Sequence, residues 1–202
     1  DGSGARGLLG GLTFKGDVTL TNLAAIRPDA KGRLTAKLDA SQARGGQPWR
    51  IALDGRGVDF ASGLAEADRL LGPKPSLALR GALAPGGVVS LASAKLDGAA
   101  ASATGAGTIS SDKLALNIDW TAQGPFRAGA LEIAGAAKGT GAITGSMAEP
   151  ALKLAADFES IDLPRLPLRQ AHLDLTFRRG ANGSDGDARL TAIYLAVPVA
   201  IA

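Results

Sequence analysis

Apolar and polar residues alternate along most of the chain. The alternation is cleanest in residues 113–122, where Leu114, Leu116, Ile118 and Trp120 are separated by polar or small residues. Because successive side chains of a β-strand point to opposite faces of a sheet, this spacing predicts a strand with one apolar and one polar face. The same spacing recurs from residue 33 to residue 178 and predicts an all-β protein.

The apolar positions of these predicted strands are expected to form one continuous surface. Charged or hydroxyl residues occupy the alternate positions, as Arg33, Thr35 and Lys37 do in the first such segment. In an open sheet this surface would line a groove, and the residues expected to line it are Leu34, Leu38, Trp49, Ile51, Leu53, Leu77, Leu79, Leu114, Leu116, Ile118, Trp120, Leu131, Ile133, Leu152, Leu154, Phe158, Leu173, Leu175 and Phe177.

Two local exceptions interrupt the alternation. Residues 62–71 carry apolar side chains at helical spacing, with Ser62 as the expected N-cap and a Gly-Pro pair directly after the segment. This pattern predicts one short helix that docks its apolar side on the sheet. Between residues 88 and 96 the parity of the apolar positions changes, which predicts a β-bulge near Ser93.

The composition leaves two architectures open. Hydrophobic residues make up 46% of the chain, but aromatic residues make up only 4%, so the apolar volume comes from small aliphatic side chains. Such side chains fill a wide interior poorly, because dense cores rely on large residues. The alternation therefore fits either a closed β-sandwich or an elongated sheet that curls into an open trough, the architecture called a β-taco.

Few residues are suited to catalysis or to metal binding. The chain has no cysteine and one histidine, His172, which lies on the polar side of its predicted strand, so we expect no metal, no cofactor and no enzyme activity. Its 22 basic and 19 acidic residues are interspersed, whereas a nucleic-acid surface clusters basic residues with aromatic ones. Nucleic acid is therefore not an expected partner.

Short motifs are interpreted as structural features. Gly2-x-Gly4-x-x-Gly7 has the spacing of a dinucleotide fingerprint but no preceding strand, and the glycines of residues 139–145 predict closely packed β-backbone. Residues 185–187 contain two aspartates in a glycine-rich segment, where we favour a plain turn over a calcium loop. Residues 182–184 match a glycosylation sequon, which carries little weight alone.

The ends of the chain are typical of a fragment. It begins without methionine, and it contains no apolar run near the ~20 residues that cross a bilayer. Residues 193–202 are apolar, like a strand whose neighbour has been left out. We therefore interpret residues 1–202 as a single piece of a longer β-structure, without separate domains.

Residues 124–168, rich in Gly, Leu and Pro, resemble the repetitive region of the TamB family, the inner-membrane-anchored subunits of the translocation and assembly module. The segments AEADRLLGPKP (65–75), LALRGAL (77–83) and SSDKL (110–114) are similar to the same family, so the resemblance extends from about residue 12 to residue 192. AsmA-like proteins, which include bridge-type lipid transfer proteins, share much of this sequence pattern. These patterns contain no catalytic signature.

The resemblance implies a location and partners that the residues alone do not. It implies a periplasmic segment of a protein anchored in the inner membrane, which shields phospholipid acyl chains between the inner and outer membranes and supports outer-membrane biogenesis. The full-length protein is expected to work with TamA, an Omp85-type outer-membrane protein. An alternative is a structural or chaperone surface that assists β-barrel assembly or autotransporter secretion, and unpaired strand edges favour end-to-end self-association.

Overall fold

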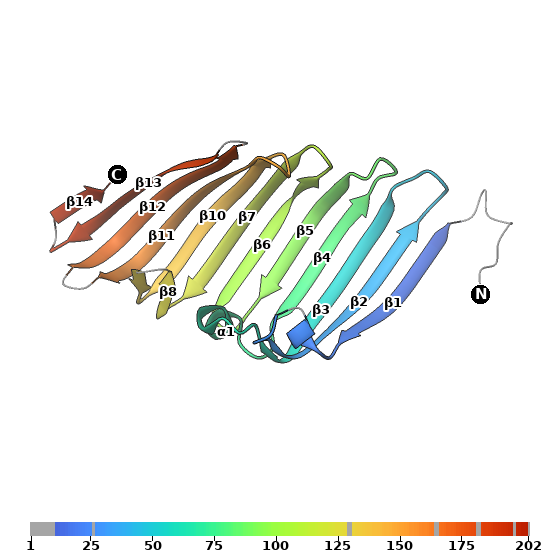
Figure 1. The fold of residues 1–202 in the computed structure, drawn as a ribbon, viewed down its shortest axis with the longest axis horizontal. Coiled ribbons are helices and arrows are strands. Elements are labelled where there is room, and N and C mark those ends of the chain that lie inside the picture. The colour runs from blue at the N-terminus through green and yellow to red at the C-terminus, as the bar shows by residue number, and fades with distance from the viewer. Residues whose placement is uncertain are drawn as a thin grey trace.

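The protein is a single layer of long antiparallel β-strands (Figure 1). The computed structural model describes residues 11–25, 27–128, 131–163, 166–180, 183–195 and 197–201. The strands are β1 (Leu12–Leu20), β2 (Lys31–Gln42), β3 (Trp49–Ala61), β4 (Ser76–Leu83), β5 (Val89–Asp97), β6 (Ala101–Ile109), β7 (Leu114–Gln123), β8 (Phe126–Ala128), β9 (Leu131–Ile133), β10 (Ala136–Gly145), β11 (Pro150–Leu163), β12 (Leu166–Gly180), β13 (Gly183–Tyr194) and β14 (Val197–Ile201). The helices are η1 (Leu23–Ala25) and α1 (Ala65–Leu71).

The strands follow one another in one open path. Their order is β1-β2-β3-β4-β5-β6-β7-β10-β11-β12-β13-β14, and the path does not close. Strands β8 and β9 lie off this path, and β9 pairs with β8 and with β11. Within the described residues no second sheet packs against the first. The open, curled all-β sheet is therefore confirmed, and the closed sandwich that the alternation also allowed is not formed.

The two long margins of the sheet differ in their connections. At one margin, the described turns that join β2 to β3, β4 to β5, β6 to β7 and β10 to β11 contain only four to six residues. The connections at the other margin carry η1, α1 and the β8–β9 pair. Figure 1 shows α1 and β8 along this lower margin. All additional elements of the fold are therefore concentrated on one side.

The predicted helix is confirmed as α1, but it is shorter than residues 62–71. Its N-cap position is Leu64 and not Ser62, and no side chain caps it. The Asp68 carboxylate instead accepts hydrogen bonds from two preceding backbone N–H groups, including that of Ser62, because an aspartate in the first turn can reach back over the helix start. Hydrogen bonds from Ser62 lower the pKa of Asp68. Gly72 ends the helix at φ 68°.

The β-bulge predicted near Ser93 is also confirmed. Arg80 of β4 is opposite Ser93, but the next residue, Gly81, is opposite Leu91. Ala92 is therefore the extra residue of β5, and the shift recurs in the pairing of β5 with β6. An extra residue reverses the parity of the following positions, which explains the change of apolar spacing in the sequence.

Two predictions for the C-terminal region are wrong. The apolar residues 193–202 do not form one strand, because the first two end β13 and β14 returns beside them. Leu195, at φ 48°, lies at this turn. The second error concerns Asp185 and Asp187, which lie inside β13, with Asp185 opposite Arg178. An extended strand holds the two aspartates apart along its length, so neither the predicted turn nor a calcium loop is formed there.

The buried core occupies only part of the sheet. It lies near the margin that carries α1, where β8 and β9 cover β7 and β10–β13, and Leu70 of α1 packs against it. Its buried residues are Ala122, Phe126, Ile133, Ala137, Ala156, Phe158, Ile161, Leu168, Ala171 and Ala192. This region supplies the tightly packed interior of the described structure.

Candidate functional site

One face of the sheet carries a band without charge that crosses the strands of the main path. Residues directly opposite each other in antiparallel strands lie on the same face, so the register groups residues into rows that cross the strands. Three rows of one face, called the apolar face below, contain only apolar residues and glycine. Row 1 is Val18, Ala36, Gly55, Leu77, Leu96, Ala103, Trp120, Gly139, Ala156, Leu173, Leu190 and Ile201; row 2 is Gly16, Leu38, Leu53, Leu79, Ala94, Gly105, Ile118, Gly141, Leu154, Leu175 and Ala188; row 3 is Phe14, Ala40, Ile51, Gly81, Leu91, Gly107, Leu116, Ile143, Leu152, Phe177 and Gly186.

The opposite face, called the polar face below, carries charges of both signs. Cross-strand ion pairs link Lys15 to Asp39 at 3.3 Å and Arg80 to Asp54 at 2.9 Å. This face is therefore suited to contact with water. One of its rows is Asp17, Lys37, Asp54, Ala78, Lys95, Thr104, Asp119, Thr140, Ala155, Asp174 and Arg189.

Side chains of the apolar face differ greatly in exposure. On β1, Phe14 is 56% exposed and Val18 is 58% exposed. By contrast, Ala156 of row 1 lies in the buried core with the β8–β9 pair and is 1% exposed. Most of the remaining bulky residues of the three rows are half-buried by their neighbours within the sheet. The apolar face is therefore open to solvent along β1–β6 and covered at one margin from β7 onward.

The glycine-rich segment 139–145 belongs to β10, and the predicted close packing of its backbone is confirmed. A Cβ atom at Gly139 would lie 2.5 Å from the carbonyl oxygen of Ala155 and 2.8 Å from the Trp120 ring. Glycine is needed here because the indole lies directly against the neighbouring backbone. The sheet thus accommodates a large aromatic side chain beside a glycine in the same row.

The register brings together most of the residues predicted to line a groove. Of the nineteen, all but Leu131 and Ile133 belong to strands of the main path and lie on the apolar face. Leu131 and Ile133 belong to β9, which lies off the main path but pairs with β8 and β11 in the same sheet. Ile133 is fully buried there. Lipid contact by all nineteen residues stays a prediction.

Sequence reasoning missed the first strand. In β1, Leu12, Phe14, Val18 and Leu20 alternate with Thr13, Lys15, Asp17 and Thr19, and these four apolar residues extend the apolar face by one strand. The alternation was visible in the sequence, although glycine at position 16 interrupts the apolar series. The cover formed by β8 and β9 was missed as well, because segments of three residues are too short to show a period.

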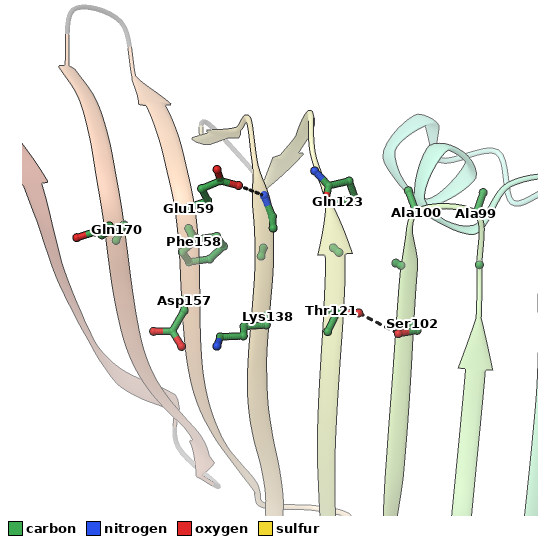
Figure 2. A pocket seen from close by; sticks show the side chains of 16 residues that line it. Ala99, Ala100, Ser102, Thr121, Gln123, Lys138, Asp157, Phe158, Glu159 and Gln170 are labelled. Carbon is green, nitrogen blue, oxygen red and sulfur yellow. Dashed lines mark hydrogen bonds between the residues drawn. The ribbon is translucent and has the colours of Figure 1, made fainter.

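The largest hollow lies on the polar face, beside the margin that carries α1. It has a volume of about 890 Å³, and Ser102, Thr121, Lys138 and Asp157 form one row along it (Figure 2). Several of its polar groups bind one another: the Ser102 and Thr121 hydroxyls are 2.9 Å apart, and Glu159 accepts a hydrogen bond from a backbone N–H. Because these polar groups already hydrogen-bond within the protein, the hollow does not define a ligand class.

His172 lies on the polar face, as its place in the sequence predicted. Its Nδ1 is 2.7 Å from Asp157 Oδ1, and its Nε2 is 3.4 Å from Asp174 Oδ2. The hydrogen bond to Asp157 and the negative charge of Asp174 raise the pKa of His172 above its ordinary value, against a smaller effect of desolvation. Two carboxylates in this position stabilise the charged form of the imidazole. The three side chains therefore form a cross-strand ion pair.

Comparisons and the remaining motifs add no further site. Among the described residues, no group of three or more His, Cys, Asp or Glu side chains is placed to hold a metal ion. No helix in the described ranges is both long enough and apolar enough to cross a membrane. The motif at Gly2, Gly4 and Gly7 and the sequon at Asn182 involve residues outside those described. No protein-family model, curated protein or solved structure matches the chain.

Proposed function

We propose that the chain is a periplasmic section of a lipid-transfer protein that holds phospholipid acyl chains along its apolar face. The proposal rests on the three uncharged rows. Each row crosses eleven or twelve strands and takes one residue from each. At about 4.8 Å between strands, a row is on the order of 50 Å long. Each CH₂ group that leaves water contributes roughly 0.8 kcal/mol, so acyl chains bind such a surface without dedicated polar contacts.

The composition of the rows supports the proposal. Bulky residues such as Leu53, Leu79 and Leu154 share row 2 with Gly16, Gly105 and Gly141, so the apolar face has gaps between its large side chains. A flexible acyl chain can fill such gaps, whereas a folded protein layer needs closely matched side chains. The charged opposite face keeps the sheet in water while the apolar face is occupied.

The resemblance of residues 124–168 to the TamB family supports the cellular setting that we propose. In that setting, the sheet is one section of a longer structure that is anchored in the inner membrane and reaches toward the outer membrane. Phospholipid would move along the rows from one strand to the next, and the full-length protein would work with TamA.

Lipid bound during expression tests the proposal most directly. The protein, exported to a bacterial periplasm and purified without detergent, is expected to retain phospholipid that native mass spectrometry detects. Extraction and chromatography then identify the bound species. The proposal would be contradicted if the purified protein contained no lipid and also took up no apolar dye.

Two adjacent residues provide a matched pair of variants. Leu116 lies in row 3 of the apolar face, and the exposed Asn117 lies beside it on the polar face. Leu116→Arg places a charge among the proposed acyl chains and is expected to abolish most lipid capture, while the side chain reaches water and the sheet stays folded. Asn117→Arg adds the same charge on the opposite face and should leave capture unchanged. Equal capture by both variants would contradict the proposed site.

A second function is favoured by the outer edge of β1. Within the described residues β1 pairs with β2 alone, and its Leu12 and Phe14 are largely exposed. Such an edge can add a strand from another chain, as a chaperone for outer-membrane β-barrel strands would. Photo-crosslinkers placed at Thr13 separate the two functions, since crosslinks to unfolded barrel proteins favour the chaperone and crosslinks to lipid alone favour lipid transfer.

A further inference from the structure

The β8–β9 pair is an insertion that the sheet does not require. Strands β7 and β10 are direct neighbours, yet residues 124–128 and 131–135, called the inserted hairpin below, lie between them in sequence and leave the main path of the sheet. The two ends of the insertion meet, because the Gly124 N–H donates a hydrogen bond to the Gly135 carbonyl at 2.9 Å. A tight turn could therefore connect the same two strands.

Close approach at the base of the inserted hairpin requires glycine at both ends. A Cβ atom at Gly124 would lie 2.6 Å from the Ile133 carbonyl oxygen. A Cβ atom at Gly135 would lie 2.5 Å from the Glu159 carboxylate. At both glycines, neighbouring atoms approach the backbone more closely than any side chain would allow.

The inserted hairpin covers a recessed part of the apolar face. Its Phe126 is 8% exposed and its Ile133 is fully buried. The three rows each carry leucine, but the neighbouring row that packs with these two side chains in the core is almost entirely alanine. That row is Ala101, Ala122, Ala137, Phe158 and Ala171.

The attachment of the inserted hairpin is limited in comparison with that of the sheet strands. Strand β9 pairs with β11 at two residue pairs, Ile133 with Ile161 and Glu132 with Asp162. Strand β10, by contrast, pairs with β11 along its length from Ala137 to Gly145. The remaining contact on the β8 side is with α1, where the Arg69 guanidinium lies 5.7 Å from the centre of the Phe126 ring.

We propose that the inserted hairpin is an internal occupant of the apolar face, which acyl chains must displace before they bind along β7 and β10–β13. This proposal rests on the proposed function, and it divides the lipid site into an open part along β1–β6 and a gated part. Phe126 and Ile133 fill the apolar space that lipid would take. The apparent lipid affinity of the gated part is lowered in proportion to the fraction of molecules with the hairpin displaced.

The two tryptophans report on the two parts separately. Trp49 lies on the apolar face in β3, and Trp120 lies in row 1 on β7, where it packs against the buried core. Trp120→Phe leaves Trp49 as the only tryptophan, and Trp49→Phe leaves Trp120. Phospholipid with brominated acyl chains quenches indole fluorescence on contact. We expect Trp49 to be quenched at lower lipid concentration than Trp120.

A reversible lock on the inserted hairpin tests the proposal, because the chain has no native cysteine. Glu132 and Asp162 are directly opposite, which is the spacing that a cross-strand disulfide requires. In Glu132→Cys/Asp162→Cys, oxidation is expected to abolish quenching of Trp120 by brominated lipid and reduction to restore it, while quenching of Trp49 stays the same. The reduced protein is the control for both substitutions.

A second variant opens the gated part permanently. Replacement of residues 125–134 by Asn-Gly, a two-residue turn that suits antiparallel neighbours, should bring the quenching of Trp120 to the level of Trp49. Quenching of Trp120 that is insensitive to both the lock and the replacement, with Trp49 quenched throughout, would overturn the hairpin proposal alone. Quenching of neither tryptophan in any variant would overturn the proposed function and the hairpin proposal together.

Discussion

The apolar face is built in the same way along β1–β6 and along β7–β13, but the two parts are covered differently. Val18 and Leu173 belong to the same row, yet Val18 is exposed and Leu173 packs against a buried core. Each part alternates apolar with polar residues, and each presents its charges on the opposite face. The difference in burial therefore does not come from the pattern along the strands.

The difference comes from one insertion. Residues between β7 and β10 pair with the end of β11 and complete a buried core with Ile161 and Leu168. Beside β1 and β2, the described structure has only η1, whose Leu23 is buried. Alternation thus decides which face is apolar, but local cover decides whether that face stabilises the fold or stays available. The covered part is expected to carry most of the stability, and the open part most of the binding.

The largest effect expected from this comparison is on unfolding. Leu168 is fully buried in the covered part, and Leu12 is 56% exposed in the open part. Leu168→Ala removes contacts and leaves a cavity, so it should lower the free energy of unfolding by about 3 kcal/mol. Leu12→Ala should lower it by less than about 0.5 kcal/mol. Urea unfolding followed by circular dichroism measures both, and similar losses would show that the two parts are equally packed.

A smaller effect is expected from two glycines of row 1. At Gly139, in the covered part, a methyl group would meet the Trp120 ring and a carbonyl oxygen, so Gly139→Ala should destabilise the sheet by about 1–3 kcal/mol. At Gly55, in the open part, the nearest atoms would be 3.8 Å away, which is ordinary contact. Gly55→Ala should therefore be neutral or stabilising by about 0.5 kcal/mol, because alanine loses less backbone entropy on folding.

Thermal unfolding of the two alanine variants checks this prediction. A variant with Trp120→Phe added to Gly139→Ala serves as a further control, since the smaller ring should relieve part of the clash. A destabilisation of Gly55→Ala as large as that of Gly139→Ala would mean that the open part is packed as closely as the covered part.

Much of the fold followed from the sequence because a period of two is a direct consequence of strand geometry. The alternation around Leu116 and Leu154 predicted both strands and the face of each, and a change of parity predicted the bulge near Ser93. A helix was predicted over residues 62–71 and forms at Ala65–Leu71, although its predicted cap, Ser62, was wrong. These features are local, so a short stretch of residues is enough to specify them.

The remaining features depend on contacts between distant residues. The sequence showed apolar positions in each strand, but the register that aligns Leu53, Ile118 and Leu175 in one row depends on all the intervening turns. The cover over the core depends on Ile133 meeting Ile161, which belongs to a strand that is not adjacent in sequence. Alternation identified Leu131 and Ile133 as strand residues, but it could not show that they pair with β11 off the main path.

The smallest effect concerns one cross-strand ion pair in each part of the polar face. Arg80 and Asp54 pair in the open part, and His172 lies between Asp157 and Asp174 in the covered part. Arg80→Gln removes an exposed ion pair that contains no histidine, so it should cost about 0.5 kcal/mol at both pH 6 and pH 8. His172 differs, because its pKa is raised above the ordinary value of 6.5, chiefly by the hydrogen bond to Asp157.

A raised pKa means that the folded protein binds the His172 proton more tightly than the unfolded chain does. The stability from this histidine is therefore fully present below pH 6.5 and is lost as the pH rises through the raised pKa of the folded state. His172→Asn should lower the free energy of unfolding at pH 6 more than at pH 8, by a small amount because the side chain is partly exposed. Urea midpoints at the two pH values measure the difference, and the Arg80→Gln variant is the pH-independent control. A His172→Asn effect that is the same at both pH values would show that the two carboxylates do not hold the imidazolium, and that the two parts of the polar face are held together in the same way.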